Sequence, residues 1–248
     1  MPQFNWKKIA LVAADIALAA YLFLAVTAFN NPDDQSAVCT KVDIAIEDAV
    51  VEGFLGENEI KAQLKKSHIF PQGQPMKEVD VRKIEETLLG NPFVDRVQCY
   101  KTQGGHVRIV IAQRLPVMRV KAANGDDYYI DSSGAVMPNT RYASNLVVAT
   151  GEVSRLYAQR TLARIGNMLL QDNFWKSQVE QLNVLPDGSL EMVPRVGNHI
   201  VFLGEPVNLN KKLERLKQFY IHGLSVAGWN KYRYINVEFD NQIICKKR

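Results

Sequence analysis

Residues 80–113 read DVRKIEETLLGNPFVDRVQCYKTQGGHVRIVIAQ, and the hydrophobic period of this stretch changes midway from helical to extended. Asp80 is a favourable helix N-cap, and apolar residues then recur every three or four positions as far as Leu88. Gly90 ends this segment, and Pro92 prevents its continuation. The first part of the stretch therefore predicts a short amphipathic helix.

Two strands are expected directly after this helix. Residues 94–102 and 106–113 are rich in β-branched residues, and Gly104-Gly105 between them favours a tight turn. In the second segment apolar and polar residues alternate, which leaves one face of the strand apolar. The pattern predicts a β-hairpin that is covered on one side.

The residues upstream complete a small domain. Residues 38–47 alternate with period two and predict a strand, and residues 57–66 predict a helix because their apolar positions lie four apart. With the helix and hairpin described above, the element order is β-α-α-β-β. This order predicts an α+β domain over residues 39–118, with two helices on a three-stranded sheet.

The remaining residues, 119–248, predict a second and larger domain. Its strands are short, its turns contain Gly, Asp and Asn, and two helical patterns interrupt the strands. We expect a hairpin at 129–136, a strand at 146–151, a helix at 153–170, strands at 179–185, 189–193 and 199–203, a helix at 211–222, and a closing hairpin at 232–239 and 242–246 that turns at Asp240-Asn241. This order predicts a mostly antiparallel β domain with two helices.

The N-terminal residues predict a membrane anchor. Residues 9–29 are apolar apart from one carboxylate, and a helix of that length spans about 31 Å, close to the thickness of a hydrocarbon core. Lys7 and Lys8 precede the run, which favours a cytoplasmic tail at 1–8 and translocation of the rest. A polar linker at 30–38 follows the run. We expect a single-pass type II topology.

Two alternatives to a simple anchor remain open. Val26-Thr27-Ala28 would serve as a cleavage site, so the first 28 residues could be a signal peptide, although the apolar run exceeds the usual signal core. Asp15 within the run either lies near the cytoplasmic interface or contacts a second membrane helix.

Composition and motifs exclude several classes of function. The chain has 248 residues, 47% of them hydrophobic and 23% charged, which is typical of a globular protein. A dispersed net charge of +4 provides no basic face for nucleic acid. The four histidines and three cysteines show no metal-ligand spacing, and no phosphate-binding or nucleophile motif appears. No cofactor and no metal site are expected, and we expect Cys39, Cys99 and Cys245 to be buried hydrophobes, although a Cys39–Cys99 bridge remains open.

Several motifs, in this order behind an anchor helix, resemble the bacterial FtsQ/DivIB cell-division family. The matching stretches are IFPQG at 69–73, LGNPFVDRV at 89–97, VIAQRLPV at 110–117, YIDSSGAV at 129–136 and YINVEFDNQI at 234–243. The resemblance implies a POTRA domain followed by the β domain of this family. It further implies a non-enzymatic scaffold in the inner membrane at the division septum, with its C-terminal part in the periplasm. Its β domain would dock FtsB-like and FtsL-like proteins, and its POTRA domain would contact other divisome members.

The closing segment is the candidate partner-binding site. It is unusually aromatic and β-branched, and a strand at the edge of a sheet carries unpaired backbone groups that can accept an added strand. The residues proposed for this contact are Tyr232, Tyr234, Asn236, Val237, Glu238, Phe239 and Ile243. An alternative that remains open is that the two tyrosines merely cover the helix at 211–222.

Two other functions compete with the scaffold. POTRA domains also occur in envelope transport and assembly factors, but the strand series that forms a membrane β-barrel is not found in this sequence. An anchored periplasmic enzyme would need a His and an Asp converging on a nucleophile such as Ser133 or Ser144.

Overall fold

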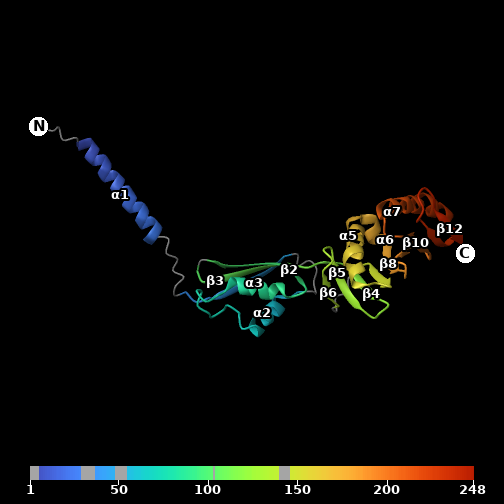
Figure 1. Cartoon of the computed structure of the whole chain (residues 1–248), viewed down its shortest axis with the longest axis horizontal. Helices are drawn as coiled ribbons and strands as arrows, with labels where there is room; N and C mark the ends of the chain where they lie inside the picture. The colour runs from blue at the N-terminus through green and yellow to red at the C-terminus, as the bar shows by residue number, and fades with distance from the viewer. Residues whose placement is uncertain (1–5, 29–36, 48–54, 103, 140–145) are drawn as a thin grey trace. The chain divides into compact units, whose positions relative to one another are not determined.

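The computed structural model describes residues 6–28, 37–47, 55–102, 104–139 and 146–248 (Figure 1). The chain forms two compact units, which are described separately. The first comprises Met1–Ala45, Glu57–Leu88 and Val97–Val110, and the second comprises Ile46–Gly56, Leu89–Arg96 and Ile111–Arg248.

The N-terminal residues form one long helix, α1 (Trp6–Ala28). A helix is therefore confirmed over most of the predicted anchor, and Phe29 and most of the linker lie outside the described residues. Over the part of the chain that the structure describes, no helix reaches the combination of length and apolarity needed to cross a membrane. Membrane anchoring through residues 9–29 stays a prediction.

The predicted β-α-α-β-β order of the first domain is confirmed. The elements are β1 (Lys41–Glu47), α2 (Glu57–Lys66), α3 (Val81–Leu89), β2 (Val94–Thr102) and β3 (His106–Gln113), and the sheet order is β1-β3-β2. The side chains of Ile60, Leu64, Ile84 and Leu88 on the two helices are buried. Asp80 caps α3, because its Oδ1 accepts a hydrogen bond from the Lys83 N–H at 3.1 Å.

A nine-stranded sheet dominates the second unit. Its order is β12-β11-β10-β9-β8-β7-β4-β5-β6. The strands are β4 (Pro116–Ala122), β5 (Asp127–Asp131), β6 (Val136–Pro138), β7 (Val148–Gly151), β8 (Val179–Val184), β9 (Leu190–Pro194), β10 (Ile200–Gly204), β11 (Tyr232–Asn236) and β12 (Ile244–Lys247). Most pairings are antiparallel, but β4–β7, β7–β8 and β10–β11 are parallel.

Helices contribute much of the apolar core of this sheet. The helix predicted at 153–170 is a continuous series, α4 (Arg155–Tyr157), the π-helical turn η2 (Ala158–Leu162) and α5 (Ala163–Gln171), and a short helix α6 (Asn173–Gln178) follows it. The second series is α7 (Leu209–Gln218), η3 (Phe219–Leu224) and α8 (Ser225–Ala227). Leu162, Ile165, Leu213 and Leu216 from these helices join one core with alternate residues of the strands.

The polar residues on the other side of the strands form a hydrogen-bonded series. Gln181 Nε2 donates to Thr150 Oγ1 at 2.8 Å, and Asn183 Nδ2 donates to Glu191 Oε2 at 3.2 Å. Strands β7, β8 and β9 are therefore amphipathic, which is the alternation that the sequence predicts for a sheet packed on one face.

A buried ion pair fixes the hairpin between β5 and β6. Asp131 Oδ1 accepts hydrogen bonds from Ser133 N, Ser133 Oγ and Ala135 N at 2.9, 2.7 and 2.8 Å. Its Oδ2 accepts from Arg114 Nη1 at 2.5 Å, and Arg114 Nη2 also donates to the Val94 carbonyl at 3.1 Å. One carboxylate therefore organises the turn and ties it to the segment before β4.

Candidate partner-binding edge of the C-terminal sheet

The aromatic strand β11 is an interior strand of the nine-stranded sheet. It pairs in parallel with β10 on one side and antiparallel with β12 on the other. The chain reverses between these two strands at Asp240-Asn241, and Asn241 takes the left-handed conformation that such a turn requires (φ 61°). The expectation that the aromatic segment itself forms the sheet edge is therefore wrong. The edge strand is β12.

Parallel pairing explains this placement. A parallel neighbour requires a crossover connection, and the helical series α7–η3–α8 provides it between β10 and β11. Ile200, Val201 and Phe202 of β10 lie opposite Tyr234, Ile235 and Asn236. The last residues then fold back and cover the free side of β11.

Aromatic neighbours hold the two predicted tyrosines in place. Tyr232 is half-buried and packs against Phe219 with ring centroids 6.2 Å apart. Tyr234 is half-buried and stacks on Phe202 with ring centroids 6.3 Å apart and ring planes at 22°. Burial raises the pKa of the Tyr234 hydroxyl, and the carboxylates of Glu191 and Glu238 raise it further. Tyr232 contacts the crossover helix, as the open alternative expects, whereas Tyr234 stacks on the neighbouring strand.

The other proposed contact residues differ in exposure. Val237 is completely buried, so its side chain belongs to the core and not to a partner surface. Asn236 is half-buried, and its Oδ1 accepts a hydrogen bond from the Glu238 N–H at 2.8 Å. Phe239 is exposed, and Ile243 is partly buried against the core.

Glu238 lies close to the backbone of the neighbouring strand. A Cβ at Gly204 would lie 2.8 Å from Glu238 Cγ, and Gly204 itself has a positive φ of 67°. Glycine at this position therefore gives the segment that follows β11 room to pass the end of β10.

The sequence predicts a strand at 242–246, but the contact residues proposed from it do not include those of the true edge, Ile244–Lys247. Ile244 and Lys246 are exposed and lie opposite Asn236 and Tyr234 on one face of the hairpin. Cys245 is half-buried opposite the core residue Ile235. The alternation of Ile244, Cys245 and Lys246 was the available signal, because it places one side chain toward the core and its two neighbours outward.

The turn before β12 is bound to helix α7 by charged groups. Arg215 Nη2 donates to the Val237 carbonyl at 2.6 Å, and Arg215 Nη1 lies 3.8 Å from the exposed Asp240 carboxylate. Lys212 on the same helix is buried, and its Nζ donates to the Leu203 and Glu205 carbonyls at 2.8 and 2.9 Å. Desolvation by burial lowers the pKa of Lys212, although the nearby Glu238 and Glu205 carboxylates oppose this shift. These contacts hold the end of β10 and the turn before β12 against helix α7.

No group of three or more His, Cys, Asp and Glu side chains in the residues that the structure describes is arranged to hold a metal ion. The hydroxyl of Ser133 donates to Asp131, and Ser144 lies outside the described residues.

The cysteines and the proposed anchor residues are placed as follows. Cys39 and Cys99 are buried and Cys245 is half-buried, and all three are free thiols. Burial raises the pKa of Cys99 to about 12, with further contributions from Glu85 and Cys39.

Lys7, Lys8 and Asp15 lie within α1, and Asp15 is exposed.

The geometry of β12 suits recognition of an extended segment. Among the described strands β12 has one neighbour, so the backbone groups on its other side are available to an added strand. Such an addition gains affinity from main-chain hydrogen bonds and specificity from alternate side chains.

Comparison with known families matches both halves of the chain. A family model described as FtsQ/DivIB, C-terminal related, matches residues 115–246, which is more than half of the chain. A model of the POTRA-like domain matches residues 37–112. A search of curated proteins found no match. The chain therefore belongs to the FtsQ/DivIB family of cell-division proteins.

Proposed function

We propose that this protein is a non-enzymatic, membrane-anchored scaffold of the division septum, which recruits FtsB-like and FtsL-like proteins by strand addition at β12. Membership of the FtsQ/DivIB family supports the role in division. The observation that carries the binding mode is the position of β12 at the edge of the nine-stranded sheet.

The side chains of β12 suit this mode. Ile244 is 50% exposed and Lys246 is exposed on the same face, next to the Tyr234–Phe202 stack. A partner strand beside β12 would place its alternate side chains against this mixed apolar and basic surface. The partner then buries apolar area near Ile244 and gains a favourable charge pairing when it carries Asp or Glu opposite Lys246.

The anchor and the first domain complete the proposal. Residues 9–29 are apolar apart from Asp15 and follow two lysines, which supports insertion with the folded body outside the cytoplasm. The POTRA-like domain, at residues 37–112, follows this segment in the sequence and provides a second surface for divisome members.

Localisation tests the scaffold itself. We expect an N-terminal fluorescent fusion of the full chain to form septal bands in dividing cells, and cross-linked membranes to yield FtsB-like and FtsL-like chains with it. Uniform membrane fluorescence, or recovery of neither chain, would contradict the proposal.

A pair of exposed apolar residues tests the edge. We expect Ile244→Glu to weaken partner recovery about tenfold or more without loss of stability, because it removes an apolar contact and adds a charge beside the added strand. Val226→Glu is the matched control, since Val226 is 86% exposed on α8 in the same unit. Equal recovery from the two variants would refute strand addition at β12.

A further inference from the structure

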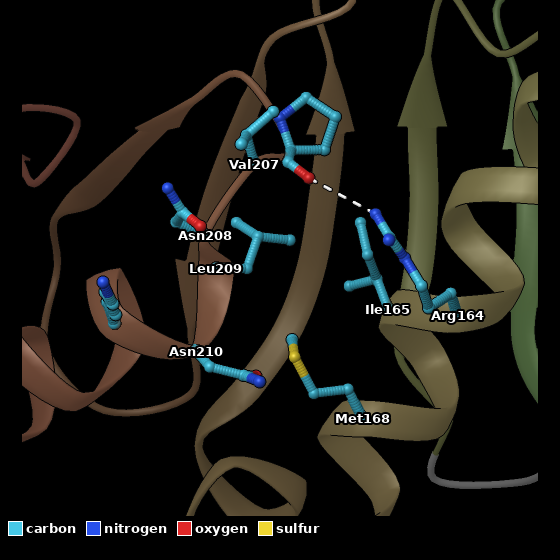
Figure 2. A pocket seen from close by; sticks show the side chains of 9 residues that line it. Arg164, Ile165, Met168, Val207, Asn208, Leu209 and Asn210 are labelled. Atoms are coloured by element: carbon cyan, nitrogen blue, oxygen red, sulfur yellow. Dashed lines mark hydrogen bonds between the residues drawn. The ribbon is translucent and has the colours of Figure 1, made fainter.

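A groove crosses the start of α7, on the side of that helix that meets α5. Its volume is about 580 Å³, and it is lined by Arg164, Ile165 and Met168 of α5 and by the loop and first helical turn at 206–211 (Figure 2). Sites that bind a few side chains of a partner or ligand have volumes of this order.

The floor of the groove is apolar. Ile165 and Leu209 are buried, Met168 is half-buried, and Figure 2 shows these three side chains around the same space. Val207 lies on the rim and is 55% exposed. An occupant can therefore bury apolar area against these side chains.

The charge of the lining has one sign. Arg164 and Lys211 are its charged residues, and the lining contains no Asp or Glu. Within the described parts of the chain neither cation forms an ion pair, and Arg164 Nη2 makes one hydrogen bond, to the Pro206 carbonyl at 3.4 Å. The N-terminal end of α7 adds the positive end of a helix dipole to the same place. The adjacent Glu205 carboxylate interacts electrostatically with the buried Lys212.

The wall of the groove is held in a preformed shape. Lys212 Nζ donates hydrogen bonds to the Leu203 and Glu205 carbonyls and so holds the start of the loop before α7. Within this loop the Val207 N–H donates to the Glu205 carbonyl at 2.8 Å. Binding to a preformed groove does not require ordering of the loop, which preserves more of the contact energy as affinity.

We propose that this groove docks an acidic amphipathic segment of a partner protein. An apolar side chain of the segment lies over Ile165 and Met168, and a neighbouring carboxylate pairs with Arg164 and Lys211. The groove uses side chains of α5 and α7, whereas strand addition uses the backbone of β12, so this inference goes beyond the proposed function and stands or falls separately.

The test uses the full-length protein in detergent and three series of synthetic peptides. The peptides are about 15 residues long and share their Leu positions, and their polar positions carry Glu, Ser or Lys. We expect the Glu series to bind, with affinity that falls as salt rises, and the Ser and Lys series to bind at least about tenfold more weakly. Binding is measured by fluorescence anisotropy of labelled peptides.

Charge reversal assigns the binding to the groove. Arg164→Glu with Lys211→Glu is expected to reverse the preference from the Glu to the Lys series. Lys176→Glu is the matched control, because Lys176 is exposed on α6 outside the groove, and it should leave the preference unchanged. Ile244→Glu should also leave it unchanged, which separates the groove from the sheet edge. If the doubly reversed variant loses its native circular dichroism, the pair Arg164→Gln and Lys211→Gln replaces it and should abolish the preference.

Four outcomes would overturn the proposal. The first is equal binding of all three peptide series, and the second is a preference for the Glu series that survives the charge reversal. The third is charge-dependent binding of phosphatidylglycerol vesicles without binding of the Glu peptides. The fourth is charge-dependent dimerisation, measured by sedimentation, without binding of the Glu peptides. The third identifies a lipid surface as the occupant, and the fourth identifies a second copy of this chain.

Discussion

Replacement of Asp131 by asparagine tests what holds the β5–β6 hairpin to the rest of the sheet. The asparagine carbonyl keeps the position of Oδ1 and can still accept hydrogen bonds from Ser133 and Ala135. The amide nitrogen replaces Oδ2, so a donor now faces Arg114 Nη1, which is itself a donor. The variant therefore removes the charge and leaves the geometry of the turn.

The expected loss follows from burial of the pair. The side chains of Arg114 and Asp131 are 18% and 6% exposed. A hydrogen bond to a charged group contributes about 1.5–3 kcal/mol, and removing one partner of a buried pair leaves the other charge uncompensated. Arg114 keeps the Val94 carbonyl and the Asp95 carboxylate at 3.8 Å, which limits the penalty. We expect a free energy of unfolding lower by about 3 kcal/mol.

Urea unfolding of the full-length protein at constant ionic strength measures this loss. The buried Trp175 reports on the second unit, and a Trp6→Phe background removes the tryptophan of α1. Asp187→Asn is the matched control. Asp187 accepts the same two bonds from Ser189, at 2.9 Å from N and 2.6 Å from Oγ, but it is exposed and no cation pairs with it in the described residues.

The pH dependence has a definite sign. Burial raises the pKa of Asp131, but the combined hydrogen bonds from Ser133, Arg114 and Ala135 and the charge of Arg114 lower it below its ordinary value. The stabilisation by ionised Asp131 is therefore complete above about pH 4, its unfolded-state pKa, and is lost as pH falls through the lower folded-state pKa. The gap between wild type and Asp131→Asn should be constant at neutral pH and should narrow in acid. Equal losses in Asp131→Asn and Asp187→Asn, or a gap independent of pH, would refute this account.

Three further outcomes follow from buried or strained positions. Lys212→Met should lower the free energy of unfolding by about 2–3 kcal/mol in urea, because the buried Leu203 carbonyl loses the lysine donor and the Glu205 carbonyl keeps only its bond from the Val207 N–H. Gly151→Ala should destabilise far more than Gly125→Ala in thermal unfolding, because both glycines have positive φ but only Gly151 would press a Cβ against the Val184 carbonyl. Burial lowers the pKa of His199. The contribution of the neutral imidazole to stability is therefore complete above about pH 6.5, its unfolded-state pKa, and declines as pH falls toward the folded-state pKa. His199→Phe should remove this decline, which urea unfolding at several pH values measures.

The sequence predicted best those elements whose limits are set by local chemistry. The helix at 57–66 and the strands at 94–102 and 106–113 have the predicted limits, because capping, glycine turns and side-chain alternation act over a few residues. Local signals were weaker at β1, which begins at Lys41 instead of 38, because Val38 forms only an isolated bridge with Pro75.

The elements that sequence reasoning missed depend on non-local pairing. Strand β4 was not predicted as a separate element, although it is an interior strand that pairs with both β5 and β7. The interior position of β11 has the same cause, since its parallel partner β10 precedes it by a whole helical series. The pattern of residues 232–239 contains no signal that β10 will pair with this segment. The two tyrosines of this segment pack on Phe202 and Phe219, and the edge of the sheet is formed by Ile244–Lys247.

The composition of that edge explains how a strand can be available to a partner and still resist self-association. A second copy paired antiparallel along β12 would bring the exposed Lys246 and Lys247 of both chains close together, and like charges on paired strands are destabilising. A partner strand with acidic residues meets no such repulsion and gains from Lys246 and from Ile244 beside it. The groove at Arg164 and Lys211 favours the same sign of charge. In the proposed strand addition, lysine at this edge would disfavour identical copies and favour acidic partners through one physical effect, and increasing salt should weaken both preferences.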